Sequence, residues 1–114
     1  MGMRTGLRAR ALGGTLLTLF LWGAAAPDTR VADKAMLGDT DGVRQLLQSG
    51  EDVNVAQGDG MTALHWAGEV GDSEMADMLI YAGANIEAIT RLGDFTPLHI
   101  AAEAGNGPVV TALL

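Results

Sequence analysis

The sequence contains no cysteine, and this absence excludes two common ways of stabilising a small protein. No disulfide can form, even in an oxidising compartment. A structural zinc site needs three or four ligands that converge on the metal. The only two histidines are His65 and His99, and neither has a second histidine within four residues. We therefore expect no metal site and no cofactor.

Basic side chains are also scarce outside the N-terminal segment. Of the seven lysines and arginines, three lie in the first ten residues, whereas all fourteen acidic residues lie at or beyond Asp28. The rest of the chain has four basic and fourteen acidic side chains, a net charge of −10. Such a chain lacks the positive surface that binds a phosphate backbone. We therefore expect no nucleic-acid partner.

Motifs that support catalysis or ion binding are few. The segment Asp39–Gly42 is similar to part of a calcium loop, but Leu37 and Gln48 stand where that loop requires an oxygen ligand and a glutamate. After the N-terminal segment the only serines are Ser49 and Ser73. Both stand next to predicted helix ends and have no histidine nearby in the sequence. The chain is therefore not expected to be an enzyme.

The longest apolar run lies close to the N-terminus. An arginine-containing start precedes sixteen mostly apolar residues, Ala11 to Ala26. A helix of that length reaches roughly 24 Å, which is short of the hydrocarbon core of about 30 Å. The pattern predicts a secretory signal peptide over residues 1–25, cleaved after Ala25, and hence an exported protein that is periplasmic or extracellular. A buried core helix and an uncleaved anchor are the alternatives.

The chain also repeats itself. The segment TALHWAGEVGD at residues 62–72 returns as TPLHIAAEAGN at residues 96–106, a step of 34 residues. A fainter copy begins 33 residues earlier, at Thr29. Repetition at this period is typical of proteins in which each unit packs on the next. The predicted units are residues 29–61 as an N-terminal cap, residues 62–95, and a truncated unit at residues 96–114.

Each unit has the signals of two short helices. Thr62 and Thr96 are suitable N-caps, and Pro97 suits the first helical position, where a missing amide hydrogen costs nothing. Gly71 and Gly105 are placed to end these first helices. Asp72 or Asn106 can then cap the second helix. Residues 51–61 and 84–95 are rich in glycine, asparagine and aspartate between β-branched residues, which predicts extended fingers with tight turns.

The pattern Thr-x-Leu-His-x-Ala, followed by glycine, a second apolar helix, Gly-Ala-x-Ile and a glycine-containing turn, resembles the ankyrin repeat family over about residues 29–114. The resemblance implies an all-α solenoid of helix-turn-helix units with β-finger loops, here preceded by an N-terminal signal helix. It also implies that each histidine bonds the threonine three positions before it and the backbone of an adjacent unit. The residues with this implied structural role are Thr62, His65, Thr96 and His99.

The first and last units depart from the family pattern. Ala32 stands where the histidine belongs, and Lys34 stands where a small alanine belongs. A polar outer face is expected of a first unit, which has no preceding neighbour. The third unit stops at Leu114, before its Gly-Ala-x-Ile segment. We therefore expect the sequence to be a fragment of a longer chain.

The resemblance implies a protein-interaction module that holds its partner on a concave face of finger tips and first helices. The positions of this chain that match that face are Gln57, Asp59, Met61, Glu69, Val70, Arg91, Leu92, Asp94, Phe95 and Glu103. Met61 and Phe95 are expected to be exposed beside acidic residues and to form an apolar anchor. The alternative is that both are ordinary surface residues.

The expected partner is another protein of unknown identity, with membrane contact only through the signal segment if that segment is retained. Two other functions remain open. The repeats would serve as the targeting or regulatory arm of a longer exported enzyme, with its catalytic domain beyond residue 114. Alternatively, they would shield an exported partner without recognising a specific ligand.

Overall fold

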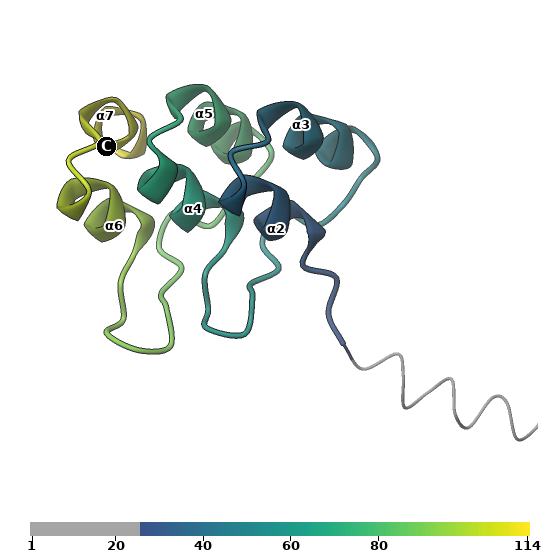
Figure 1. Cartoon of the computed structure of the whole chain (residues 1–114), viewed down its shortest axis with the longest axis horizontal. Helices are drawn as coiled ribbons and strands as arrows, with labels where there is room; N and C mark the ends of the chain where they lie inside the picture. The colour runs from purple at the N-terminus through teal and green to yellow at the C-terminus, as the bar shows by residue number, and fades with distance from the viewer. Residues whose placement is uncertain (1–25) are drawn as a thin grey trace, which may run out of the picture.

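The structure, a computed structural model, describes residues 26–114, so the predicted signal peptide lies outside the described residues. Three helix pairs stand side by side (Figure 1). Helices α2, α4 and α6 form one row, called here the inner row, and α3, α5 and α7 form the outer row above it. The six helices in residues 26–114 are α2 (Arg30–Met36), α3 (Thr40–Gln48), α4 (Ala63–Val70), α5 (Ser73–Tyr81), α6 (Pro97–Glu103) and α7 (Gly107–Leu113).

The helices begin where the sequence predicts N-caps. The hydroxyl of Thr62 accepts a hydrogen bond from the His65 amide, and the His65 ring accepts one from the Thr62 amide, which completes a capping box. Thr96 and His99 form the same arrangement at α6. Asp72 accepts from the Met75 amide at 3.0 Å and so caps α5. Such caps satisfy amide groups that the first helical turn leaves unpaired.

The segments predicted as β-finger loops form fingers (Figure 1), and residues 26–114 contain no β-strand. Each finger has one backbone bond across its base, Gln57 amide to Met61 carbonyl at 2.9 Å and Thr90 amide to Phe95 carbonyl at 3.0 Å. Side chains also accept hydrogen bonds from backbone amides of the fingers. The Met61 amide, for example, donates to the Asp59 carboxylate at 3.0 Å. A strand ladder requires consecutive backbone pairs, which these fingers lack.

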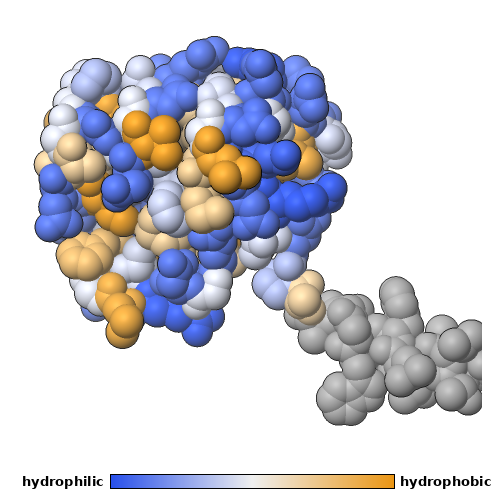
Figure 2. Space-filling view, viewed as in Figure 1, coloured by the Kyte–Doolittle hydropathy of each residue, from blue (hydrophilic) through white to orange (hydrophobic). Residues whose placement is uncertain are grey.

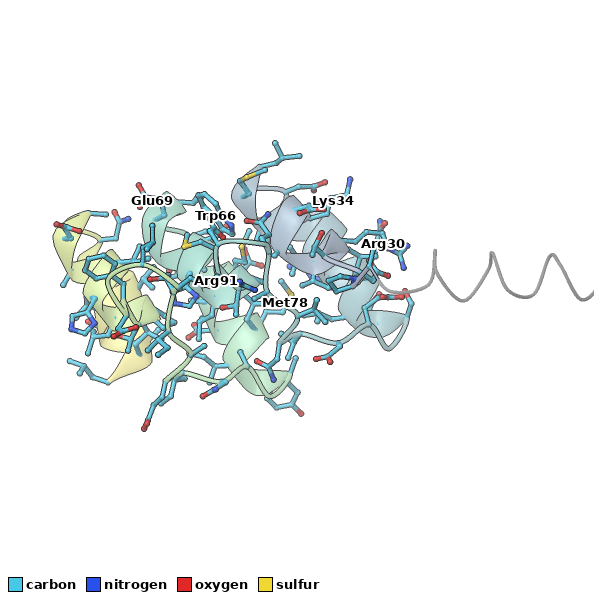
Figure 3. The ribbon with its side chains drawn as sticks, turned by 90° about the horizontal axis from the view of Figure 1, so that it is seen from below. Arg30, Lys34, Trp66, Glu69, Met78 and Arg91 are labelled. Atoms are coloured by element: carbon cyan, nitrogen blue, oxygen red, sulfur yellow. The ribbon has the colours of Figure 1, made fainter. Side chains whose placement is uncertain are left out.

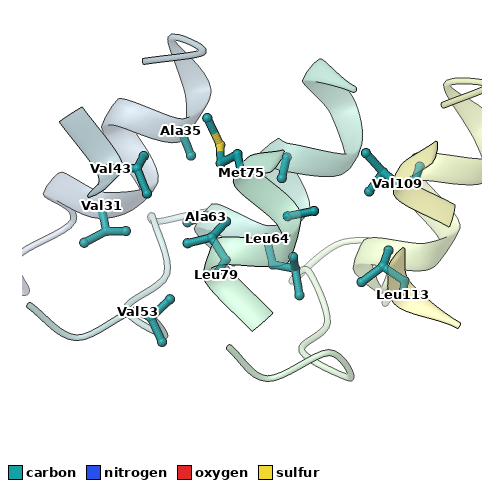
Figure 4. Close-up of a cluster of buried hydrophobic side chains, with 13 residues drawn as sticks. Val31, Ala35, Val43, Val53, Ala63, Leu64, Met75, Leu79, Val109 and Leu113 are labelled. Carbon is teal, nitrogen blue, oxygen red and sulfur yellow. The ribbon is translucent and has the colours of Figure 1, made fainter. Parts of the chain in front are cut away.

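The core is continuous through the three pairs (Figure 4). Leu64 and Leu79 in the middle pair are almost fully buried, and each contributes about 1.5–3 kcal/mol by leaving water. Valines and alanines fill the contacts toward the other two pairs. The buried residues outside the middle pair include Val31, Ala35, Val43, Ala101, Val109 and Leu113.

Small residues allow the inner helices to approach closely. A Cβ atom added at Gly68 in α4 would lie 3.1 Å from the Pro97 carbonyl oxygen and 3.3 Å from the Ala101 Cβ atom in α6. These distances are at the limit of ordinary contact. Glycine at this position therefore places α4 directly against α6.

Polar contacts also join consecutive units. The Thr40 hydroxyl donates to the Asp72 carboxylate, and Arg44 pairs with Glu74 at 2.8 Å. Asn106 does not cap α7 as the sequence suggested. Its side-chain nitrogen, Nδ2, instead donates to the Gly68 carbonyl in the preceding unit at 2.6 Å. This asparagine therefore closes the end of α4 rather than the start of its own next helix.

The two residues of the first unit that depart from the family pattern have different surroundings. Lys34, which replaces the small alanine, is exposed and lies 3.7 Å from the Asp39 carboxylate. Ala32, which replaces the histidine, is fully buried.

Among the helices of residues 26–114, none combines the length and hydropathy needed to cross a bilayer.

Candidate interaction surface

His65 links α4 to the finger at residues 84–95 of the same unit. The ring is fully buried, and its Nδ1 atom accepts from the Thr62 amide at 3.0 Å. Since Nδ1 accepts, the proton resides on Nε2, which donates to the Phe95 carbonyl at 2.9 Å. Burial lowers the pKa of His65, against an opposing effect of the bond to Phe95. The neutral ring therefore holds the base of residues 84–95 against α4.

His99 makes only the local half of this arrangement. Its Nδ1 atom lies 3.1 Å from the Thr96 amide and 2.9 Å from the Thr96 hydroxyl, as at the equivalent Thr62 and His65. The ring is exposed, and within residues 26–114 it bonds to no carbonyl of another unit. It also packs edge-on against the Phe95 ring at a centroid distance of 6.2 Å. The bond from the ring to a finger carbonyl is therefore observed at His65 and not at His99. Because Phe95 belongs to the same predicted unit as His65, a histidine bond to an adjacent unit stays a prediction.

The two fingers support each other. The Arg91 amide in the second finger (residues 84–95) donates to the Asp59 carbonyl in the first finger (residues 51–61) at 3.0 Å. Gly60, with a positive φ of 88°, permits this approach, because an added Cβ atom would lie 2.9 Å from the Arg91 nitrogen. The fingers are thus held in register beside the inner helices.

Gln57, a predicted partner contact, is already engaged within the protein. Its Nε2 atom donates to the Asp33 carboxylate at 2.8 Å. Its Oε1 atom accepts from the indole nitrogen of Trp66 at 2.8 Å. The chain of bonds from α2 through the first finger to α4 fixes the side chain of Gln57. This residue therefore positions the surface rather than offering free polar atoms to a partner.

Trp66 packs against the core from α4, and its indole nitrogen donates to Gln57. It is half-buried and neighbours Glu69 along one side of the stack (Figure 3). Trp66 precedes Glu69 by three positions in α4, and residues three apart share a face of a helix.

The two fingers and α6 line a hollow of about 520 Å³. Leu92 is 86% exposed and Phe95 43% exposed at its margin. Hydrophobic atoms gather near the lower end of the finger that precedes α6, with hydrophilic atoms around them (Figure 2). The residues that line the hollow are Gly58, Asp59, Met61, Thr90, Arg91, Leu92, Phe95 and Ile100.

Met61 does not form the exposed anchor that the sequence suggested. Its side chain is only 9% exposed. The residue immediately precedes the Thr62 N-cap, and its amide is held by Asp59. Met61 lines the hollow but contributes little accessible surface. The exposed apolar groups of this region are instead Leu92 and Phe95.

A second hollow of about 280 Å³ adjoins the first. Phe95 and Ile100 line both hollows, so they form the ridge between them. Glu69 and Glu103 occupy equivalent positions in α4 and α6 and line only the second hollow. We call the two hollows together the finger–helix groove; its lining residues used below are Asp59, Glu69, Arg91, Leu92, Phe95, Ile100 and Glu103.

Two predicted partner contacts lie outside the groove. Val70 is exposed at the end of α4, and Asp94 is exposed beside the turn of the second finger, where it has a positive φ of 52°. Neither lines either hollow. No three histidine or acidic side chains in residues 26–114 converge on a site that would hold a metal ion. The groove is therefore an apolar recess with a charged margin.

Comparison with known proteins places this arrangement in a family. Residues 32–114 match the family model described as ankyrin repeats in three copies. The chain is 35% identical to mouse RelA-associated inhibitor over 88 residues, which are 77% of this chain and 11% of that protein. It is 36% identical to human ankyrin repeat domain-containing protein 40 over 66 residues, 57% of this chain and 18% of that protein.

The same segment is similar to part of an enzyme. It is 33% identical to Drosophila melanogaster palmitoyltransferase Hip14 over 72 residues, 63% of this chain and 11% of that protein. The matches to these three relatives thus span less than a fifth of the length of each. Because the family model covers most of the sequence and the stacked helix pairs agree with it, the chain belongs to the ankyrin repeat family.

Proposed function

We propose that the finger–helix groove is the surface on which this protein holds a protein partner. As a set of ankyrin repeats, the chain is a protein–protein interaction module. The observation that supports this site is the pair of adjoining hollows that share Phe95 and Ile100. Recessed apolar surface with a charged margin is the usual centre of a protein interface.

The surroundings of the groove are organised before any partner arrives. His65 holds the Phe95 carbonyl, Gln57 holds Trp66, and the Arg91 amide holds the first finger. A surface with fixed side chains loses less conformational entropy on binding. This pre-organisation supports binding by a rigid face rather than by folding of a loop around the partner.

The test uses charge substitutions in exposed groove residues. Leu92→Asp and Phe95→Asp should abolish capture of a cross-linked partner from the cells that make the protein, because each places a carboxylate in the apolar recess. Both residues are exposed and the Phe95 carbonyl is retained, so circular dichroism should be unchanged. Tyr81→Asp is the matched control, since Tyr81 is 96% exposed and lies outside the groove. Equal capture by all variants would contradict the proposal.

Export is a further part of the proposal. The basic start followed by the apolar run from Ala11 supports a cleaved signal peptide over residues 1–25. N-terminal sequencing of the protein from a periplasmic or extracellular fraction should begin at Ala26. Recovery of Met1 or Gly2 at the N-terminus of protein in the cytosolic fraction would overturn export.

A second candidate function is that these repeats form the targeting or regulatory arm of a longer exported enzyme. The match to a short part of a palmitoyltransferase supports this candidate, because that relative is an enzyme. Sequencing the transcript beyond codon 114 tests it. Further repeats followed by a stop codon favour binding alone, whereas a new domain with clustered histidine, serine or cysteine favours an enzyme.

A further inference from the structure

We propose that the finger–helix groove takes an extended segment of its partner in which a bulky apolar residue lies close to an arginine or lysine. The apolar side chain would occupy the larger hollow, and the cation would lie between Glu69 and Glu103 in the smaller one. This inference rests on the proposed function, and it specifies the chemistry of the partner.

The larger hollow selects an apolar side chain. Leu92 and Phe95 stand exposed on one side of it, and the half-buried Ile100 lies on the side of α6. Met61 and Thr90 are buried beneath them. An apolar group placed here leaves water and covers carbon atoms that the fold leaves exposed.

The charges at the margin select a cation. Glu69 and Glu103 line the smaller hollow and are exposed, and within residues 26–114 neither has a salt-bridge partner. The other basic residues of this region are engaged elsewhere. Arg30, Lys34 and Arg44 each lie within 4 Å of an acidic side chain outside the groove.

Arg91 is the single basic side chain that lines the groove. It lines the larger hollow together with Asp59, so that hollow has one positive and one negative side chain. The smaller hollow has two carboxylates and no basic side chain among its lining residues. The negative charge is thus concentrated in the smaller hollow, which makes it complementary to arginine or lysine.

The apolar lining of the smaller hollow suits the long side chains of arginine and lysine. Phe95 and Ile100 provide apolar surface against which the methylene stem of arginine or lysine packs, while its charged end reaches a carboxylate. A guanidinium group also stacks favourably on an aromatic ring such as that of Phe95. An acidic or purely apolar residue would leave Glu69 and Glu103 without a counter-charge.

The two hollows meet at Phe95 and Ile100, so one short segment fills both. In an extended chain, side chains on the same face are spaced by about 7 Å, because each residue advances about 3.3 Å. The apolar residue and the cation are therefore expected within a few positions of each other. A second copy of this protein is a poor occupant, because residues 26–114 have a net charge of −10 and would repel one another.

The experiment is a selection of random twelve-residue peptides displayed on phage, with the full chain as bait. Enriched peptides should contain arginine or lysine within three positions of a leucine, methionine or aromatic residue. With the variant Glu69→Gln/Glu103→Gln as bait, the basic residue should no longer be enriched, whereas the apolar residue should remain. Glu87→Gln is the matched control, because Glu87 is exposed and lines neither hollow.

An enriched peptide should then bind the double variant at least tenfold more weakly than the unmodified chain, measured by fluorescence polarisation at 50 mM salt. Peptides that bind, and are lost with Phe95→Asp, but lack enriched basic residues would overturn this inference and leave the proposed function standing. No enrichment above the Phe95→Asp control would overturn both. Self-association of the chain that Phe95→Asp abolishes would assign the groove to a second copy and would also overturn the inference.

Discussion

The two Thr-x-Leu-His segments have nearly the same sequence and the same capping geometry, yet their histidines have different surroundings. His65 is buried and bonds both to Thr62 and to the Phe95 carbonyl. His99 bonds to Thr96 and is exposed. The capping box is therefore a local structure, whereas the bond from the ring to a backbone carbonyl depends on the finger that lies over the ring.

The largest expected effect comes from removing these histidines one at a time. His65→Ala leaves the Thr62 amide and the Phe95 carbonyl without partners in a buried place and opens a cavity. We expect a loss of about 3 kcal/mol in the free energy of unfolding. His99→Ala removes one local bond at an exposed cap and should cost below about 1 kcal/mol. Urea denaturation monitored by circular dichroism measures both, and equal losses would show that the bond to Phe95 contributes nothing.

A smaller effect is expected from the equivalent pair Gly68 and Ala102. Gly68→Leu forces a side chain between α4 and α6, where an added Cβ atom alone would lie 3.1 Å from the Pro97 carbonyl oxygen. Overpacking of this kind should cost about 2 kcal/mol. Ala102 is exposed in α6, so Ala102→Leu should change stability by less than about 0.5 kcal/mol. Thermal denaturation of the two variants tests the difference, and a tolerated Gly68→Leu would contradict close packing of the inner helices.

The smallest effect expected is the response of stability to pH. Burial lowers the pKa of His65 below the value near 6.5 that an unfolded histidine has. As the pH falls through 6.5, the unfolded chain binds the proton first, so the free energy of unfolding decreases toward acidic pH. The decrease in the free energy of unfolding should level off once His65 is protonated in the folded state as well.

The ring protons of His65 provide a direct measurement. Nuclear magnetic resonance titration of the His99→Gln variant leaves one histidine to observe, and its pKa should lie below 6.5. Urea denaturation of the same variant at pH 7.5 and pH 5.5 should retain the loss of stability toward acid. Titration of His65 at or above 6.5 would refute the role of burial.

Much of the fold was predictable because its signals are local. Thr62, Thr96, Gly71 and the apolar spacing of the second helices act within a few residues, and the helices lie where these signals place them. The period of about 33 residues likewise predicted stacked helix pairs. The fingers form no strands, because the side chains of Asp59 and Thr90 take bonds that a ladder would have used.

The groove was predictable only in part. Leu92, Phe95, Glu69 and Glu103 line it, and their contact with a partner stays a prediction. Gln57 turned out to hold Asp33 and Trp66 instead of facing a partner freely. Met61 is buried although it borders the finger turn. These outcomes depend on contacts between residues far apart in the chain, and no local pattern encodes them.

By itself, the sequence determined the family, the repeat period, the helix caps and the acidic character of residues 26–114. Each of these depends on interactions within one turn of helix or on composition, which neighbours in space do not alter. Only the tertiary structure decided which histidine bonds to a finger carbonyl, which side chains line the groove, and where two glutamates line the same hollow. Those features require separate units to be brought together, because burial and charge proximity are properties of the packed surfaces and not of the residues alone.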